Sequence, residues 1–415
     1  MVISLFSCTF AKFFYMEQTK EKGQGVRRAV DTTRHHRENG WDYRGRAVYH
    51  FTFPVEGRFP LFGTLEGESA ERAFIKLNPF GYRVYQILCG LPQFYAAKGF
   101  ALKVLAQKVM PDHIHLVIQV LEPLSQSIGA VVRGFKSACT MVYKQEFLSC
   151  GENATEVHSI ANRQGNAAEV HGRASQQGNA AALMHFARIF ANRNSIWQQD
   201  AAYYHERILH APGQLNRMIN YVKDNPRRLW LKKNNPDLFR LHRHTEMCGL
   251  SFTSLGNHFL LDWHDNQTVE MPRNATVEQV QKRLQLAMAA AQNGAVTYTA
   301  AISKGEQLIA RTLRKQGYPL VVLLSDGFPK EGSPHERFYK PGGIYFEACS
   351  KGQLLLLEPT EQTFLNEDIQ SAVEGTLRRK AAERHYDYKQ IPPTSQRYRF
   401  VALNEIAKRL ARIER

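Results

Sequence analysis

The sequence predicts an α+β domain followed by an α/β domain. Its 415 residues exceed what one hydrophobic core usually supports, so two domains are expected. In the first half, strand-like and helix-like segments alternate, and a tight turn joins two of the strands, which favours an antiparallel sheet. In the second half, single strands alternate with helices, which is typical of a parallel sheet.

Four strands are expected in the first half, at residues 46–55, 100–110, 113–121 and 202–210. The first of them, RAVYHFTFPV, is rich in β-branched and aromatic residues. Pro111 and Asp112 form the turn between the second and third strands, so these two are expected to be antiparallel neighbours. The strand at 113–121 is therefore expected to be central in the sheet.

Three helices are expected in the same half, at residues 77–97, 125–147 and 212–223. The last should end at Asn225-Pro226, because proline disfavours helical backbone in the residue before it. The resulting order β-α-β-β-α-β-α is a ferredoxin-like plan with one additional helix.

Two segments fall outside this plan. A tandem repeat of period 13 lies between Cys150 and Phe186, and its small and polar residues predict a disordered surface insertion at 150–185. Residues 1–43 are expected to be a poorly ordered leader. Their apolar start lacks the pattern of a secretory signal, and Met16 is a candidate for the true start.

In the second half, strands are expected at residues 259–262, 295–299, 319–325 and 353–357, and helices at 277–292, 303–314 and 346–351. Thr276 and Ser303 are predicted to cap the first two of these helices. The alternation predicts a Rossmann-like domain over 245–360. Residues 361–415 are expected to form a charged helical tail, broken at Pro392-Pro393.

The charge of the chain favours a polyanionic partner. The net charge is +16, and residues 1–240 hold 31 lysines and arginines against 19 aspartates and glutamates. Nucleic acid is the natural partner, because cationic side chains release the counterions condensed on phosphates. A basic protein with no nucleic-acid role is the alternative.

The cysteines and the hydropathy pattern bear on the compartment. The six cysteines are scattered without a CxxC pair, which favours reduced thiols in the cytoplasm. No apolar run reaches the roughly 20 residues that a membrane span needs, so no membrane partner is expected.

The strongest candidate for chemistry is the triplet His113-Ile114-His115, which opens the strand at 113–121. Side chains alternate along a strand, so both imidazoles should project from one face, where they can bind one divalent metal. A second triplet with His242 and His244 lies among charged residues, so the spacing alone is weak evidence. Structural histidines without a metal are the alternative.

Three segments in order resemble the HUH single-tyrosine transposases, and especially their REP-associated branch. They are the triplet after Val109-Met110-Pro111-Asp112, the segment from Ile196-Trp197-Gln198 to Leu209, and the run from Ile219 to Pro226. The match covers about residues 44–235. It implies a domain of HUH endonuclease type in which His113 and His115 bind a divalent metal, Tyr221 is the nucleophile on single-stranded DNA, and Asn225 matches a third metal ligand.

The chemistry of these residue types agrees with that role. A tyrosine hydroxyl, with a pKa of about 10, is a weak nucleophile, so attack on a phosphodiester needs a metal to polarise the phosphate. Tyr221 and Asn225 are four residues apart and share one helix face. Two imidazoles and an amide oxygen leave positions for phosphate and water, which suits Mg²⁺ or Mn²⁺. The resemblance implies a 5′-phosphotyrosine link and a free 3′-hydroxyl.

Basic and aromatic residues near these motifs are candidate DNA contacts, with a solvated basic face or a core tryptophan as the alternatives. They are Arg133, Lys136, Lys223, Arg227, Arg228 and Trp197. The expected substrate is single-stranded or hairpin-bearing DNA, and a homodimer is compatible with it. The rival functions are a DNA-binding protein that has lost cleavage and an RNA-binding module, which would expose aromatic residues on its sheet.

The second half contains one further candidate site. Ser303-Lys304-Gly305 begins a predicted helix, where backbone amides can take a phosphate, and a plain capped helix is the alternative. Residues 294–359 loosely resemble the Rossmann-like domain of DNA-processing protein A, which implies binding of single-stranded DNA or a nucleotide. Here the glycine-rich stretch of that family is replaced by residues 297–302, TYTAAI.

Overall fold

A computed structural model describes residues 38, 40–145, 195–198, 205–329, 331–332, 343–385 and 391–412. The chain divides into two compact units, the first within residues 31–231 and the second within residues 232–415. The predicted insertion at 150–185 and most of the predicted leader lie outside the described residues. None of the helices described has the length and apolar character that crossing a bilayer requires.

A four-stranded sheet forms the centre of the first unit, in the order β4-β5-β1-β6. Its strands are β1 (Ala47–Pro54), β4 (Leu102–Val109), β5 (His113–Val120) and β6 (His205–Ile208). All neighbours are antiparallel, so the predicted antiparallel sheet is confirmed and β5 lies inside it. A hairpin of β2 (Gly63–Glu66) and β3 (Phe74–Leu77) was not predicted, because strands of four residues carry little pattern. The turn η1 (Glu56–Arg58) follows β1.

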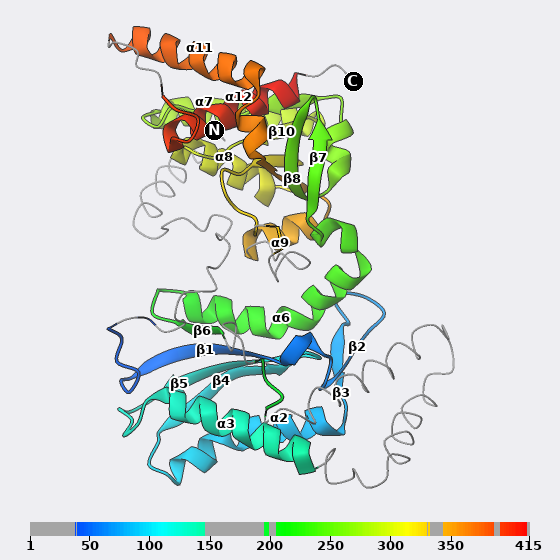
Figure 1. Cartoon of the computed structure of the whole chain (residues 1–415), viewed down its shortest axis with the longest axis vertical. Coiled ribbons are helices and arrows are strands. Elements are labelled where there is room, and N and C mark those ends of the chain that lie inside the picture. Colours follow the sequence, from blue (N-terminus) through cyan, green and yellow to red (C-terminus); the bar gives the residue numbers. More distant parts are fainter. Residues whose placement is uncertain are drawn as a thin grey trace, which may run out of the picture. The chain divides into compact units, whose positions relative to one another are not determined.

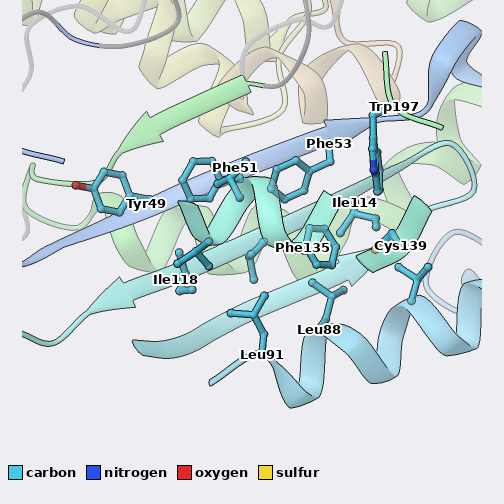
Figure 2. Close-up of a cluster of buried hydrophobic side chains, with 14 of the residues drawn as sticks. Tyr49, Phe51, Phe53, Leu88, Leu91, Ile114, Ile118, Phe135, Cys139 and Trp197 are labelled. Carbon is cyan, nitrogen blue, oxygen red and sulfur yellow. The ribbon is translucent and has the colours of Figure 1, made fainter. Parts of the chain in front are cut away.

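Helices cover both faces of this sheet. Figure 1 shows α2 (Pro79–Ala96) and α3 (Ile128–Tyr143) on one face and α6 (Gln214–Asn234) on the other. Tyr49, Phe51 and Phe53 alternate along β1 and pack against α2 and α3 in the main core (Figure 2). Because successive side chains of a strand point to opposite faces, His50 and Thr52 are directed toward α6.

Helix α6 continues through Pro226, so the predicted end at Asn225-Pro226 is wrong. A proline inside a helix removes one backbone hydrogen bond and costs about 3 kcal/mol. Val222, Asn225, Pro226 and Arg228 are all buried, so packing of this face offsets that cost. The Asn225 side chain also donates a hydrogen bond from Nδ2 to the carbonyl oxygen of Tyr221, at 2.7 Å.

The second unit is built on a six-stranded sheet in the order β7-β8-β12-β11-β10-β9. The strands are β7 (His242–Met247), β8 (Leu250–Gly256), β9 (Asn266–Thr268), β10 (Val296–Thr299), β11 (Leu320–Leu323) and β12 (Leu354–Pro359). Strands β9 to β12 are parallel, as the alternating pattern predicts, whereas β7 and β8 join them antiparallel.

One predicted strand in this unit is wrong. Residues 259–262 belong to a 3-10 helix, η4 (His258–Asp262), which follows η3 (Pro236–Phe239) in the chain. The side chain of Asn257 caps η4 by accepting a hydrogen bond from the Phe259 amide at 3.1 Å. A run of three apolar residues does not distinguish a strand from a helical turn, and the cap decides in favour of the turn.

The helices of the second unit are α7 (Val277–Gln292), α8 (Lys304–Lys315), α9 (Gly343–Ser350), α10 (Glu361–Phe364), α11 (Glu367–Glu383) and α12 (Gln396–Ala411). Thr276 and Ser303 cap α7 and α8 as predicted, each in a capping box. Helix α12 buries Tyr398, Leu403 and Ile406 in the core of this unit. The predicted tail is helical at residues 396–411, and this helix is part of the packed unit.

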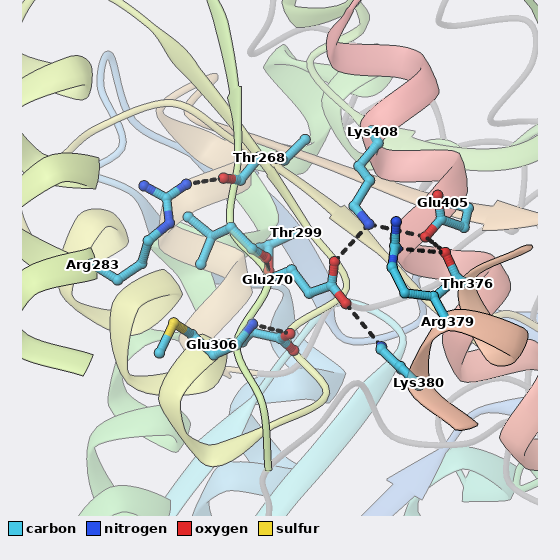
Figure 3. Close-up of polar contacts among 12 residues, drawn as sticks. Thr268, Glu270, Arg283, Thr299, Glu306, Thr376, Arg379, Lys380, Glu405 and Lys408 are labelled. Carbon is cyan, nitrogen blue, oxygen red and sulfur yellow. Dashed lines mark hydrogen bonds and ion pairs between the residues drawn. The ribbon is translucent and has the colours of Figure 1, made fainter. Parts of the chain in front are cut away.

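A polar network fastens the last helices to the segment after β9 (Figure 3). Glu270 forms ion pairs with Lys408 at 2.7 Å and with Lys380 at 3.3 Å, and Lys408 forms a further one with Glu405 at 2.9 Å. Burial opposes the charge of Glu270, but the two lysines outweigh it and hold the pKa of this carboxyl below its ordinary value. The network therefore joins α11 and α12 to one half-buried carboxylate.

Candidate active site

The two histidines of the first triplet form a buried pair on the α6 side of the sheet. They are 8% and 3% exposed on β5, and their Nε2 atoms lie 3.1 Å apart. The alternation of side chains along the regular strand β5 brings this about, as predicted. His113 and His115 thus present the same ring nitrogen to a single point.

The other nitrogen of each ring is held by the protein. The Nδ1 atom of His113 lies 2.5 Å from Oδ1 of Asp112. The Nδ1 atom of His115 lies 3.0 Å from the hydroxyl of Thr52 and 3.1 Å from Nε2 of His50. Partners of this kind fix the tautomer and the orientation of histidines that bind metals.

These residues fit a divalent metal. Two imidazole nitrogens about 2.1 Å from one octahedral ion are about 3 Å apart, which is the separation of the two Nε2 atoms. When Nδ1 carries the hydrogen in both rings, the Nε2 lone pairs face each other, and a cation between them removes the repulsion. Clusters of three or more histidine, cysteine or carboxylate side chains suited to a metal are absent from the described part of the chain. The donor set that the structure brings together here is the two imidazoles.

Tyr221 stands over this pair on α6. Its ring centroid is 5.4 Å from that of His115 and 6.4 Å from that of His50, and both contacts are edge-on. The half-buried ring packs on the small apolar cluster of Val117, Leu209 and Val222. The structure therefore brings Tyr221 to the histidine pair, although more than 100 residues separate them in the sequence.

Asn225 lies one helical turn beyond Tyr221 and is 8% exposed. Its Nδ2 atom is occupied by the Tyr221 carbonyl, and Oδ1 makes no hydrogen bond within the described residues. An amide oxygen is an acceptable ligand for Mg²⁺ or Mn²⁺. The tertiary fold thus keeps Asn225 on the helix that carries Tyr221, with its acceptor atom available.

His50 is a residue of this site that was not predicted. It is buried on β1, stacks on His115 with ring centroids 5.2 Å apart, and meets Tyr221 edge-on. The signal was present in the alternation Tyr49-His50-Phe51-Thr52, which places two polar residues on the face opposite two aromatic ones. Nothing in the sequence, however, indicates that this face is shared with β5.

The basic residues of α6 differ in their surroundings. The guanidinium of Arg228 is buried and lies 5.4 Å from the centroid of the Tyr221 ring. Arg227 makes two hydrogen bonds to the carboxylate of Asp224, at 2.6 and 3.0 Å, so its charge already has a protein partner. Lys223 is exposed. Arg228 is therefore placed at the candidate nucleophile, whereas Lys223 lies at the surface of α6.

The predicted DNA contacts on α3 are not at this site. Arg133 is exposed on α3, which packs on the sheet face opposite to α6 (Figure 1). Lys136 is 7% exposed, and burial lowers its pKa to about 8. An amphipathic helix with basic residues does not reveal which side of the sheet it covers, so the sequence could not show that these two residues and Tyr221 lie on opposite sides.

The predicted stacking role of Trp197 is also wrong. This side chain is 1% exposed and packs among Phe53, Phe62 and Phe135 (Figure 2). Its indole Nε1 donates a hydrogen bond to the carbonyl oxygen of Lys136 at 3.0 Å. Both ring faces are therefore in the core, where no base can reach them. Two other tyrosines of the segments that resemble the transposases, Tyr203 and Tyr204, lie outside the described residues.

The predicted phosphate site at Ser303-Lys304-Gly305 is occupied by the chain itself. The buried carboxylate of Glu306 accepts hydrogen bonds from the amides of Ile302, Ser303 and Met271, at 2.6 to 2.9 Å. A methyl group on Gly305 would lie 3.1 Å from the side chain of Val280, so this glycine serves helix packing. The plain capped helix is thus the correct interpretation.

Comparison with known proteins concerns mainly the first unit. Residues 90–161 match the family model described as "Transposase IS200 like", a segment that holds His113 and His115 and ends before Tyr221. No curated protein matches the chain. A solved structure of a "putative transposase" from Deinococcus radiodurans R1 is 13% identical, with a TM-score of 0.23 over 45% of this chain and 95% of that one. Similarity at that level transfers neither fold nor function. The segment that contains the histidine pair is thus similar to the IS200-like transposases.

Proposed function

We propose that the first unit is a metal-dependent transposase that cleaves single-stranded, hairpin-bearing DNA and transfers the strand through Tyr221. The observation that carries this proposal is the convergence of the Tyr221 ring on a buried histidine pair, with ring centroids 5.4 Å apart and Nε2 atoms 3.1 Å apart. The match of residues 90–161 to the IS200-like family supports it.

His113, His115 and Asn225 would hold a divalent Mg²⁺ or Mn²⁺ ion, which polarises the scissile phosphate when bound. The Tyr221 oxygen then forms a bond to phosphorus, and the bond between phosphorus and the upstream 3′ oxygen breaks. The phenolic proton leaves Tyr221, and a proton is added to the 3′ oxygen. The products are a 5′-phosphotyrosine and a free 3′-hydroxyl, and the reverse attack by a 3′-hydroxyl rejoins a strand.

Three further side chains would support this step. His50 and Thr52 hold His115 through Nδ1 and so orient its Nε2 atom. The Arg228 guanidinium at the Tyr221 ring offsets the negative charge that the tyrosine oxygen carries when it departs in the rejoining step. His50 is therefore a positioning residue, and Arg228 an electrostatic one.

The first unit would belong to the REP-associated branch of the HUH transposases and would act as a homodimer in the cytoplasm. The second unit would be Rossmann-like and would help to hold the nucleic acid. The net charge of +16 supports nucleic acid as the partner of the whole chain.

The test uses the full chain, Mn²⁺, and a pool of single-stranded oligonucleotides that carry one hairpin followed by a random segment. A 5′-phosphotyrosine keeps the downstream fragment on the protein, so a label at the 3′ end should remain with the protein on a denaturing gel, and a label at the 5′ end should not. Tyr221→Phe should remove the adduct. Tyr82→Phe, which changes an exposed tyrosine on α2, should retain it.

The same assay separates the rival functions. A folded wild-type protein that binds the pool but forms no adduct with Mg²⁺ or Mn²⁺ would be a non-catalytic binding protein. An RNA-binding module would present aromatic residues on an open sheet face, whereas Tyr49, Phe51 and Phe53 are buried under α2 and α3. This observation favours the transposase over the RNA-binding module.

A further inference from the structure

A row of polar side chains crosses the sheet at the histidine pair. The register places Lys108 of β4 opposite His115, His115 opposite Thr52 of β1, and Thr52 opposite His205 of β6. Residues directly opposite each other in antiparallel strands project from the same face, with their Cβ atoms about 5 Å apart. Lys108 therefore projects from the α6 face, next to His115.

The neighbours of Lys108 confirm this orientation. Val109 and Ile114, the next opposite pair, lie in the main core under α2 and α3. Ala106 and Val117, the pair two residues before Lys108, lie in the cluster with Tyr221. The alternation is thus regular on both sides of Lys108, and its side chain belongs to the face that holds Tyr221.

Lys108 is a half-buried cation without an anionic partner in the described part of the chain. No ion pair or hydrogen bond joins its side chain to any residue in that part of the chain. Arg227, by contrast, is paired with Asp224. Burial holds the pKa of Lys108 below its ordinary value, and no nearby charge counteracts it. A cation that has lost water and gained no carboxylate is suited to an anionic ligand.

We propose that Lys108 contacts the substrate by binding a non-bridging oxygen of the phosphodiester that Tyr221 attacks. This inference rests on the proposed function, because the same face must hold the phosphate between the histidine pair and Tyr221. Lys108 and His115 are directly opposite each other on this face, so a phosphate held at the histidine pair would lie within reach of the lysine. Lys108 then stabilises the charge that grows on the phosphate oxygens during attack.

The test compares Lys108→Gln with Lys103→Gln. Lys103 is on the same strand, is exposed and pairs with Gln119, so its replacement removes the same charge away from His115. One arm measures the rate of adduct formation with a hairpin oligonucleotide that the wild type cleaves. The other measures binding of a 30-nucleotide poly-dT strand in EDTA as a function of salt, and needs no cleavage. Circular dichroism checks folding, and Lys108→Met serves if the glutamine variant does not fold.

Lys108→Gln should slow adduct formation about 10- to 100-fold, the effect of losing one charge-assisted hydrogen bond. It should also reduce the salt slope of binding by about 0.7, the value for one phosphate contact on a single strand. Lys108→Arg should restore most of the rate, and Lys103→Gln should leave the rate near that of the wild type.

The outcomes separate the two proposals. If the wild type forms an adduct and Lys108→Gln equals it in rate and salt slope, the role of Lys108 is overturned and the proposed function stands. If the wild type forms no adduct but Lys108→Gln alone lowers the slope, the phosphate contact stands and the proposed function fails. Equal losses in the Lys108 and Lys103 variants would overturn a specific contact.

Discussion

The two His-x-His triplets of this chain adopt different structures. His113 and His115 lie on a regular strand and bring their Nε2 atoms to 3.1 Å. His242 and His244 lie on β7, where the register shifts between His242 and Thr245 and His244 adopts a φ of 55°. This left-handed residue breaks the alternation that a shared face requires. His244 is exposed, and His242 packs edge-on against His258 at 4.5 Å.

The position of each strand in its sheet explains the difference. Strand β5 is bonded on both sides, to β4 and β1, so its register is held throughout. Strand β7 is an edge strand bonded only to β8, where irregularities are common. The same three-residue spacing therefore brings the two imidazoles together on the internal, regular strand and not on the irregular edge strand.

Replacing one histidine in each triplet should show the largest difference between the two triplets. His115→Ala should abolish both the adduct and saturable Mn²⁺ binding, because one imidazole cannot form the pair. His242→Ala should leave both intact. Titration of Mn²⁺ by electron paramagnetic resonance and the adduct gel measure the two effects. Equal Mn²⁺ binding by wild type and His115→Ala would contradict the metal site.

Removing the support of His115 should give the next largest effect. His50→Ala takes away one of the two partners of the His115 Nδ1 atom, so Mn²⁺ affinity should fall about 10- to 100-fold. The same titration measures it, with His258→Ala in the second unit as a control. A change in protein melting without any change in Mn²⁺ affinity would mean that His50 is only a core residue.

Asp112 should have a smaller effect. Asp112→Asn keeps an acceptor for the His113 Nδ1 atom but removes the negative charge, so Mn²⁺ affinity should fall about tenfold. Asp112 also lies 3.7 Å from Arg58, so Arg58→Gln controls for loss of that ion pair. If both variants lose affinity equally, the effect comes from the turn and not from the histidine.

The smallest expected effect is that of acid on the second histidine pair, His242 and His258. Burial, and then the neighbouring His242, lowers the pKa of His258, against the opposing influence of the Gly256 backbone and Asp237. The unfolded state then binds the proton more tightly, so the stabilisation is complete above about pH 6.5 and is lost as pH falls through the folded pKa. The hydrogen-exchange protection factors of β7 and β8, which are corrected for the intrinsic exchange rate at each pH, should fall between pH 7.5 and 5, and His258→Gln should weaken that fall. An equal fall in the variant would assign it to other groups.

Much of the local structure was predictable. The cap at Thr276 and the bounds of α7 agree with the structure, because both depend on neighbouring residues alone. The same holds for β5, whose apolar run and preceding turn are local signals. The predictions that were wrong also have a physical cause. Pro226 does not end α6, because buried contacts from distant strands offset the local cost of proline.

The sequence by itself determined that His113 and His115 share a face and that Tyr221 and Asn225 share another, since these follow from the periods of strand and helix. Only the tertiary structure decided that the two faces meet. It also brought His50 to His115 across 65 residues, buried Trp197 and filled the start of α8 with Glu306. Local spacing sets the direction of a side chain, whereas its partner depends on which strands and helices pack together.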